Sequence, residues 1–399
     1  MRNIYFLSRS CLATVIPMVA CAMLTTPTWG QTTPNLNIIV GPSLQLGDLG
    51  KAKEVDLVVS PTGVIAAFVP TERWPGREKQ AWMAYRVSAD GGLTWTGQFE
   101  APMLDQAKPV VGVGQTVDQL PKGAIKRVGL WEHMVRPPIW FAARYARFSD
   151  DMLTYQVEAL RAEVPQAIVL ITEPDGVAHK TENVKPLYNH DQMIHLNERE
   201  LLLAMYGTFK NDVKLRSFLI RSLDGGRLWR TFATIGYESD DPDPNLPGKF
   251  SGFLNPTIAQ LPSGKLLAVM QTHDSQTPPY KPLYASWSND SGANWSQPKP
   301  TQPNLFSVSP ILVTLDNGII ACAHGKPGLA IAFSANEGHT WTQDYPLPNV
   351  SVSQITGQID IVKIGPNKLL ALAGVGSGGT RVFPITVEML PDGPSVSRQ

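Results

Sequence analysis

An eight-residue motif recurs four times in this chain and constrains its fold more than any other feature. Each copy reads Ser-x-Asp/Asn-x-Gly-x-x-Trp, and the copies occupy residues 88–95, 222–229, 288–295 and 334–341. The Asp or Asn side chain can accept N–H groups of its own turn, and the Gly supplies a positive φ. A worn copy, "ARFSDDMLTYQ" at residues 146–156, lacks the Gly. The repetition predicts a structural unit that pins a hairpin, without a catalytic role of its own.

Short apolar runs separated by Gly, Pro, Asn and Asp surround each copy of the motif. Segments such as "PTIAQLPSGKLLAVMQT" predict a strand, a turn and a second strand, and a third strand such as "SFLIRS" leads into the motif. One unit is therefore four antiparallel strands, the blade of a β-propeller. Five such units and a final hairpin, "IDIVKIGPNKLLALAG", predict an all-β chain with six blades. We expect the strand at residues 36–41 to pair with the last blade and close the ring.

The first thirty residues predict export. Arg2 and Arg9 precede the apolar run "CLATVIPMVACAML" and a small-residue exit, which is typical of a signal peptide at residues 1–30. The segment "MVAC" leaves open the alternative of a lipid anchor through Cys21. We expect the propeller domain to occupy residues 36–390 and the mature protein to be secreted or periplasmic.

Composition excludes several classes of partner. The chain of 399 residues has 34 basic and 34 acidic side chains, so its charge gives no reason to expect nucleic acid or an anionic membrane surface. We expect a monomer with no transmembrane segment in the mature chain, no cofactor and no metal. Cys322 is the one cysteine certain to remain after processing, and its apolar strand predicts a buried, inert thiol.

The repeated Ser-x-Asp/Asn-x-Gly-x-x-Trp motif, one copy to a blade, resembles the Asp box of the sialidase superfamily. Members of that superfamily are six-bladed propellers with this turn. The resemblance covers residues 36–390. It implies three arginines that clamp a carboxylate, an acid/base aspartate, and a tyrosine nucleophile activated by a glutamate. This sequence departs from the arginine, glutamate and tyrosine positions, where the nearest polar residues are Lys53, Asn255, Gln271, Lys326 and Gln358. The resemblance therefore predicts the fold and an altered specificity, without the typical sialidase catalytic residues.

Charged and imidazole side chains in the loops that lead to the ring axis are the candidates for a site. The catalytic candidates are Glu72 or Glu78 as acid/base, with His190 and Asp191. The candidates for binding substrate are Lys53, Arg77, Asn255, Gln271, His273, His324, Lys326 and Gln358. Each has a structural alternative, since residues 71–80 also fit a charge-balanced surface loop and His190–Asp191 a local turn. The acidic segment "SDDPDPN" at residues 239–245 lacks the spacing of a calcium loop and favours a flexible interblade linker.

These observations predict an exported sialidase-like protein that acts on extracellular carbohydrate. The first hypothesis is an exo-acting glycoside hydrolase of altered specificity. The alternative is a non-catalytic carbohydrate-binding or scaffold propeller.

Overall fold

The structure is a computed structural model, and the chain divides into two units, Met1–Thr32 and Thr33–Gln399. All described residues belong to the second unit. They are residues 36–46, 55–71, 81–97, 99–103, 125–127, 132–134, 140–163, 167–172, 178–181, 193–209, 211–273, 279–306, 308–325, 329–348, 359–374 and 379–390. Regular structure in these residues is entirely β, as the sequence predicts. Across them, no helix has the length and apolar character that crossing a membrane requires.

Three of the sheets are regular four-stranded antiparallel units, in which the strands pair in chain order. Sheet 1 contains β3 (Asp56–Val59), β4 (Ile65–Thr71), β5 (Ala81–Ser88) and β6 (Phe99–Met103). Sheet 3 contains β17 (Leu254–Gln260), β18 (Leu266–Gln271), β19 (Tyr284–Ser288) and β20 (Lys299–Pro300). Sheet 4 contains β21 (Val308–Thr314), β22 (Ile320–Gly325), β23 (Leu329–Ser334) and β24 (Tyr345–Pro346).

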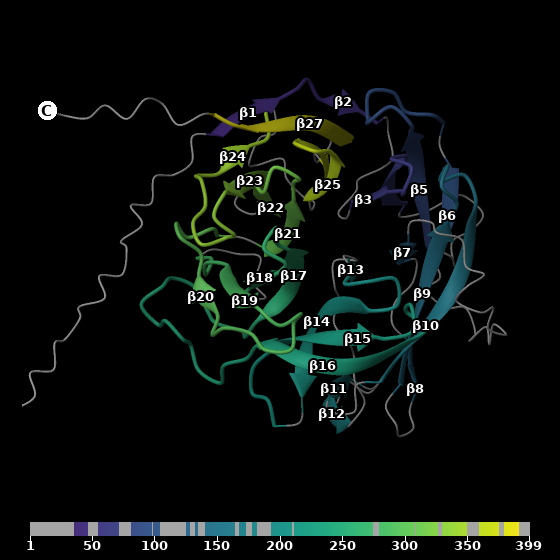
Figure 1. Ribbon diagram of the computed structural model, residues 1–399. Coiled ribbons are helices and arrows are strands. Elements are labelled where there is room, and N and C mark those ends of the chain that lie inside the picture. The colour runs from purple at the N-terminus through teal and green to yellow at the C-terminus, as the bar shows by residue number, and fades with distance from the viewer. Residues whose placement is uncertain are drawn as a thin grey trace, which may run out of the picture. The chain divides into compact units, whose positions relative to one another are not determined.

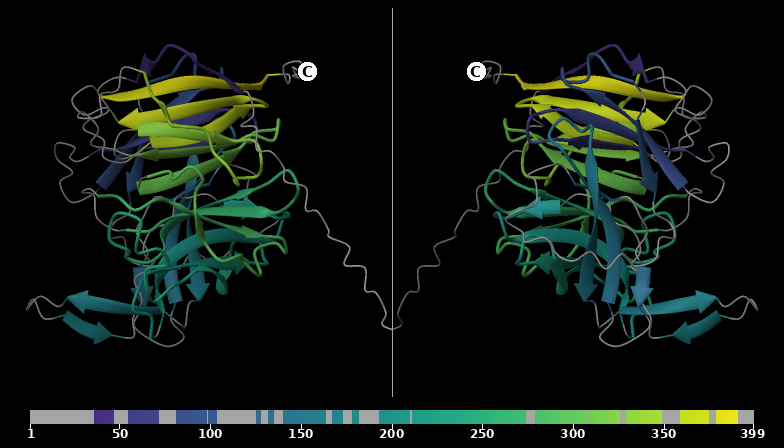
Figure 2. Two further views of the ribbon diagram at one scale, coloured as in Figure 1. Left: turned by 90° about the vertical axis from the view of Figure 1, so that its left-hand side faces the viewer. Right: turned by 90° about the vertical axis from the view of Figure 1, so that its right-hand side faces the viewer.

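Sheet 5 joins the two ends of the described chain. It contains β25 (Ile359–Gly365), β26 (Lys368–Gly374), β27 (Thr380–Met389), β1 (Leu36–Val40) and β2 (Leu44–Gln45). β1 pairs antiparallel with β27, from Leu36 opposite Met389 to Val40 opposite Ile385. Figure 2 shows the purple β1 beside the yellow strands of this sheet. The predicted closure by residues 36–41 is confirmed.

Sheet 2 has ten strands and corrects the predicted number of blades. It contains β7 (Ile125–Arg127), β8 (Glu132–Met134), β9 (Trp140–Phe148), β10 (Tyr155–Glu163), β11 (Ala167–Thr172), β12 (Ala178–Thr181), β13 (Met193–His195), β14 (Leu201–Phe209), β15 (Arg216–Ser222) and β16 (Leu228–Gly236). β10 and β16 pair in parallel, with Arg161 opposite Leu228. This pairing merges two expected blades, so the described residues form five sheets and the prediction of six is wrong.

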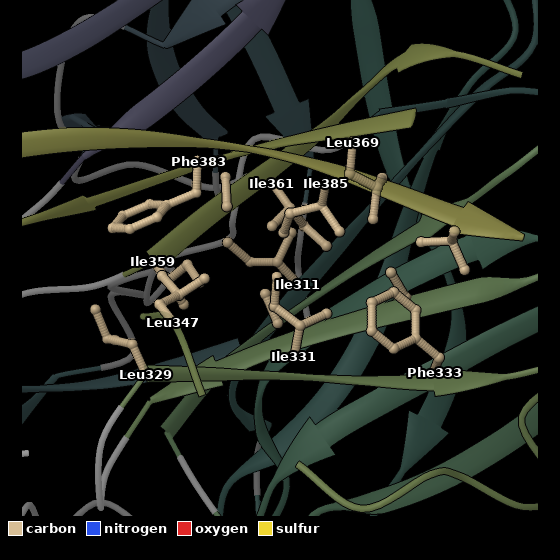
Figure 3. Packing of buried hydrophobic residues seen from close by; sticks show 14 of the residues in the cluster. Ile311, Leu329, Ile331, Phe333, Leu347, Ile359, Ile361, Leu369, Phe383 and Ile385 are labelled. Carbon is tan, nitrogen blue, oxygen red and sulfur yellow. The ribbon is translucent and has the colours of Figure 1, made fainter. Parts of the chain in front are cut away.

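The five sheets pack side by side around a common centre, and sheet 5 packs against sheet 1. In Figure 1, β3, β13, β17, β21 and β25 lie nearest that centre. The buried clusters that join neighbouring sheets contain Phe68 with Phe148, Leu219 with Leu266, Leu267 with Leu312, Ile331 with Ile361, and Leu57 with Leu372. Figure 3 shows the cluster between sheets 4 and 5. Because both faces of a blade are covered, β18, β22 and β23 are buried at every residue and their sequences are mostly apolar.

The repeated motif forms the same turn in each of its four copies. The Ser hydroxyl accepts the N–H of the Gly four residues later at 2.8–2.9 Å. The Asp or Asn Oδ1 accepts the main-chain N–H of the residue four positions after it at 2.9–3.0 Å. In the last copy Gly338 has a φ of 82°, and a Cβ there would lie 2.6 Å from Leu267 Cδ2 of sheet 3. The turn therefore requires Gly both for its backbone and for its contact with the preceding sheet.

The worn copy also forms a turn. Ser149 Oγ donates to Asp151 Oδ1 at 2.5 Å, and Asp151 Oδ1 accepts the N–H of Leu153 at 3.0 Å. Met152 takes the positive φ, 59°, that Gly takes elsewhere. The hydrogen bonds from Ser149 and Leu153 lower the pKa of the Asp151 carboxyl. The sequence pattern thus located a fifth turn despite the missing Gly.

Candidate functional site

Register places the repeated turn at one end of a sheet and the candidate site at the other, as sheet 3 illustrates. In sheet 3, Leu266 at the start of β18 pairs with Ser288, where the repeated turn begins. Gln271 at the end of β18 pairs with Leu254, where the innermost strand β17 begins. We call this second end, at which the innermost strand enters a sheet, the entry end. The innermost strands lie nearest the common centre in Figure 1, and clefts between packed elements are where folds of this kind can hold a ligand.

Two neighbouring sheets carry the same irregularity at their entry ends. β17 shifts register against β18 between Leu254 and Thr257, and β21 shifts against β22 in the same way. Within each shift a polar residue that precedes a proline has a positive φ, 44° for Asn255 and 52° for Ser309. Bulges redirect side chains, and strained non-glycine residues gather at functional sites. The entry ends of sheets 3 and 4 are therefore the candidate functional site.

The Gln271 carboxamide joins these two irregular strands. Its Oε1 accepts a hydrogen bond from Asn255 Nδ2 at 2.7 Å and another from the main-chain N–H of Ser309 at 3.0 Å. Its Nε2 donates to the main-chain oxygen of His273. Gln271 is buried, whereas Asn255 is only half-buried. The buried amide thus fixes the backbone of both sheets and holds Asn255 at the surface of the entry end.

The chemistry of this group is that of recognition. Carboxamides do not titrate in the physiological range, so Asn255 and Gln271 are neither acid nor base. Within the described contacts, Asn255 uses one Nδ2 hydrogen, which leaves Oδ1 and the second hydrogen for a ligand. An acceptor and a donor side by side match the hydroxyl groups of a neutral sugar. The group can therefore orient a polyhydroxylated ligand.

The two predicted histidines of this region are buried. His273 is 1% exposed and its ring lies 5.5 Å from that of Tyr280, centroid to centroid. His324 is 3% exposed, and its Nε2 lies 3.0 Å from Asp344 Oδ1. Cys322, two residues earlier on β22, is free and buried, as predicted. Burial and, to a smaller extent, the Asp344 carboxylate raise the pKa of its thiol, which keeps it protonated and unreactive.

Eight of the twelve predicted site residues lie outside the described residues. They are Lys53, Glu72, Arg77, Glu78, His190, Asp191, Lys326 and Gln358. Their roles stay predictions. Of the four that are described, Asn255 and Gln271 contact each other, and Gln271 also bonds to the main chain of His273.

Sequence reasoning missed Asp360, a buried carboxylate at the start of β25. Its Oδ2 accepts the N–H of Leu57 in sheet 1 at 2.5 Å, and its Oδ1 accepts the N–H of Ile361 at 2.7 Å. Thr257 stands at the equivalent place in sheet 3, where its Oγ1 accepts the N–H of Leu312 in sheet 4 at 3.1 Å. Aligning the sequences of β17 and β25 would have shown that Thr257 and Asp360 occupy equivalent polar positions. We read Asp360 as a link between sheets and not as an acid.

Comparison with known families and structures agrees with a β-propeller fold. Residues 179–353, less than half of the chain, match the family described as BNR repeat-like domain. The fold is a β-propeller, and the matched BNR repeat-like segment lies within it. The resemblance predicted from the repeated motif is thereby confirmed. No curated protein matches the chain.

Solved structures with a similar fold cover most of this chain. An unknown function protein from Dyadobacter fermentans is 16% identical, with a TM-score of 0.56 over 88% of this chain and 99% of that one. An α-L-arabinanase from Penicillium chrysogenum, complexed with arabinobiose, is 14% identical, with a TM-score of 0.54 over 87% and 98%. A mutant α-L-arabinofuranosidase from Fusarium graminearum, in complex with an iminosugar inhibitor, is 13% identical, with a TM-score of 0.55 over 88% and 98%. At these identities the likeness concerns the fold.

Proposed function

We propose that this protein is an exported, sialidase-like glycoside hydrolase that acts on neutral extracellular glycans from their ends. The observation that carries the proposal is the Asn255–Gln271 pair at the entry end. These amides stand where the sialidase resemblance implies a glutamate and an arginine. An uncharged pair neither clamps a substrate carboxylate nor activates a tyrosine, but it does bind hydroxyl groups.

The comparisons support a neutral sugar as the first substrate class to test. Two of the similar folds carry the names arabinanase and arabinofuranosidase, and one of them was solved with arabinobiose. Arabinose polymers have no carboxylate, which agrees with the loss of the arginine clamp. We therefore place arabinose-containing glycans ahead of sialic acid conjugates.

Catalysis requires a carboxyl group near a second carboxylate or another nucleophile at the entry end. Glu72 and Glu78 are the proposed acids, because in the sequence they fall between Thr71, where β4 ends, and Ala81, where β5 begins, and these two strand ends lie at the entry end of sheet 1. His190 and Asp191, just before β13, are the proposed second group. Export through the first thirty residues brings the protein to extracellular glycans.

A hydrolysis screen tests the proposal directly. Debranched arabinan, p-nitrophenyl α-L-arabinofuranoside and sialyllactose are each incubated with the mature protein, with Glu72→Gln and Glu78→Gln variants in parallel. We expect sugar release from an arabinose substrate, none from sialyllactose, and loss of turnover in one of the two variants. Glu388→Gln, which changes an exposed carboxylate on β27, is the matched control. Release of sialic acid contradicts the neutral-sugar assignment.

A non-catalytic carbohydrate-binding propeller is the second candidate. It is favoured by the same observation, since an amide pair binds hydroxyl groups without doing acid–base chemistry. Calorimetric binding of arabinobiose by wild type and by both variants, with no turnover in any, supports this candidate over the hydrolase.

A further inference from the structure

Lys281 is a fully buried lysine whose ammonium, among the described residues, contacts the loop that connects sheets 2 and 3. It is 0% exposed and lies just before β19. Its Nζ forms an ion pair with Asp241 Oδ2 at 2.8 Å. It also donates to the main-chain oxygens of Asp243 at 2.9 Å and Leu246 at 3.2 Å. An ammonium has three N–H donors, and each of these has an acceptor.

The three oxygen acceptors form a cation site, and the Lys281 ammonium occupies it. One carboxylate and two main-chain carbonyls, all from residues 241–246, are the ligand types that hard cations prefer. The loop folds around them through local bonds, from Asp243 N to Asp241 Oδ1 and from Asn245 N to Asp243 Oδ1, each 3.1 Å. The sequence predicted a flexible linker here. The structure instead shows a loop ordered around an internal ammonium.

Residues that follow this loop lead directly into the candidate site. Ser251 N donates to the main-chain oxygen of Thr272 at 2.9 Å, and Phe253 N donates to that of Leu215 at 2.9 Å. Gly248 packs so closely on the Lys281 segment that a Cβ there would lie 2.6 Å from Lys281 N. Asn255 follows two residues after Phe253. The path of residues 239–253 therefore determines where β17 begins.

The pKa of Tyr284 is sensitive to the carboxylates of the same loop. The Tyr284 hydroxyl is buried and has no hydrogen-bond partner within the part of the chain that the structure describes, and the residue is 1% exposed. Burial, together with the carboxylates of Asp241 and Asp243, raises the pKa of Tyr284 to about 12. Removing this hydroxyl leaves every contact of the ammonium in place, so Tyr284→Phe is a matched control at the same location.

We propose that Lys281 is a positioning residue, whose ammonium is the internal cation that orders residues 239–253 and thereby fixes Asn255 at the entry end. The structural part of this inference stands without a ligand. Its consequence for sugar affinity rests on the proposed function.

Hydrogen exchange measured by mass spectrometry tests the ordering. In Lys281→Ala we expect peptides within residues 239–260 to exchange at least about tenfold faster, because the loop loses all three donors. Peptides of sheet 5 should exchange at the wild-type rate. Tyr284→Phe and Lys265→Ala, which removes the partner of Glu337 at the far end of sheet 3, should leave residues 239–260 unchanged. Equal protection of this segment in wild type and Lys281→Ala overturns the inference.

If Lys281→Ala does not fold, Lys281→Met, which keeps most of the packing but not the charge, replaces it in the same comparison.

Chemical rescue separates the ammonium from general packing. Propylammonium replaces the atoms that Lys281→Ala lacks beyond Cβ, so 50 mM propylammonium chloride should restore protection, and equal sodium chloride with 1-propanol should not. Restoration by the sodium and propanol mixture contradicts an ammonium-specific role.

The effect on ligand binding is measured separately by calorimetry with arabinobiose. Where wild type binds it, Lys281→Ala should bind at least about tenfold more weakly and recover in propylammonium; unchanged affinity shows that Lys281 does not position the site. Where wild type does not bind it, the arabinose assignment fails, and the exchange experiment still decides the role of Lys281.

Discussion

The link from Asp360 to sheet 1 should contribute strongly to closure of the propeller. In Asp360→Val, the N–H groups of Leu57 and Ile361 lose a carboxylate acceptor, and both residues are buried, at 6% and 0% exposure. A hydrogen bond to a charged group contributes about 1.5–3 kcal/mol, and a buried donor left without an acceptor costs about 1–3 kcal/mol. We therefore expect Asp360→Val to lower the free energy of unfolding by about 2–4 kcal/mol.

The equivalent position in sheet 3 supplies the decisive comparison. Thr257 makes the same kind of link with its hydroxyl, so Asp360→Thr should keep the bond to Leu57 N and most of the stability. Threonine and valine have nearly the same shape, and the difference between the two variants isolates the hydrogen bond. Thr257→Val should in turn cost about 1–2 kcal/mol at the boundary of sheets 3 and 4.

Urea denaturation followed by tryptophan fluorescence measures these differences. Lys363→Gln, on the same strand as Asp360, is the control, because it removes a surface ion pair with Asp316 whose side chains are 42% and 55% exposed. Such a pair contributes about 0–1 kcal/mol. The reasoning is refuted if Asp360→Thr and Asp360→Val lose the same stability, or if Asp360→Val costs no more than Lys363→Gln.

Three further predictions concern the candidate site, the repeated turn and a close backbone contact. Gln271→Leu should lower stability by about 1–3 kcal/mol, because it removes the acceptor of Ser309 N, and should abolish arabinobiose binding; urea denaturation and calorimetry check both. Hydrogen bonds from Thr94 and Ser88 lower the pKa of Asp90 to about 2, so its contribution to stability should be complete above pH ~4 and lost as pH falls through 2, which carboxyl NMR titration can follow. Gly252→Ala should cost at least about 2 kcal/mol in urea denaturation, because φ is 110° and the new Cβ would lie 2.3 Å from the main chain of Leu215.

Local patterns in the sequence predicted the parts of the fold that depend on local chemistry. The repeated turn needs only its own Ser, Asp or Asn and Gly, so its hydrogen bonds could be inferred from a single copy. The pairing of β1 with β27 followed from an unpaired strand at each end of the chain. The merging of two blades was not predictable in this way, because the parallel contact of β10 with β16 depends on how two units meet in space.

The candidate site was only partly visible in the sequence for a related reason. Asn255 and Gln271 were found through positions that the family resemblance marks. Ser309 acts through its main-chain N–H, which has no sequence signature. Lys281 and residues 241–246, which its ammonium contacts, are separated along the chain. A single lysine in an apolar segment gives no sequence signal for a buried ion pair with Asp241.

The repeated unit shows where this propeller has departed from its own symmetry. Asp360 and Thr257 both accept a main-chain N–H from the next sheet, whereas Ile311 at the equivalent place in sheet 4 packs into the hydrophobic cluster with Ile361. The position thus joins neighbouring sheets in all three cases, through a hydrogen bond to the main chain in two of them and through hydrophobic packing in the third. The bulged, positive-φ residues at the entry ends of sheets 3 and 4 are a departure of another kind, since sheet closure does not need them. Positive-φ residues other than glycine gather at functional sites, which is why the Asn255–Gln271 pair is the first place to test for a ligand.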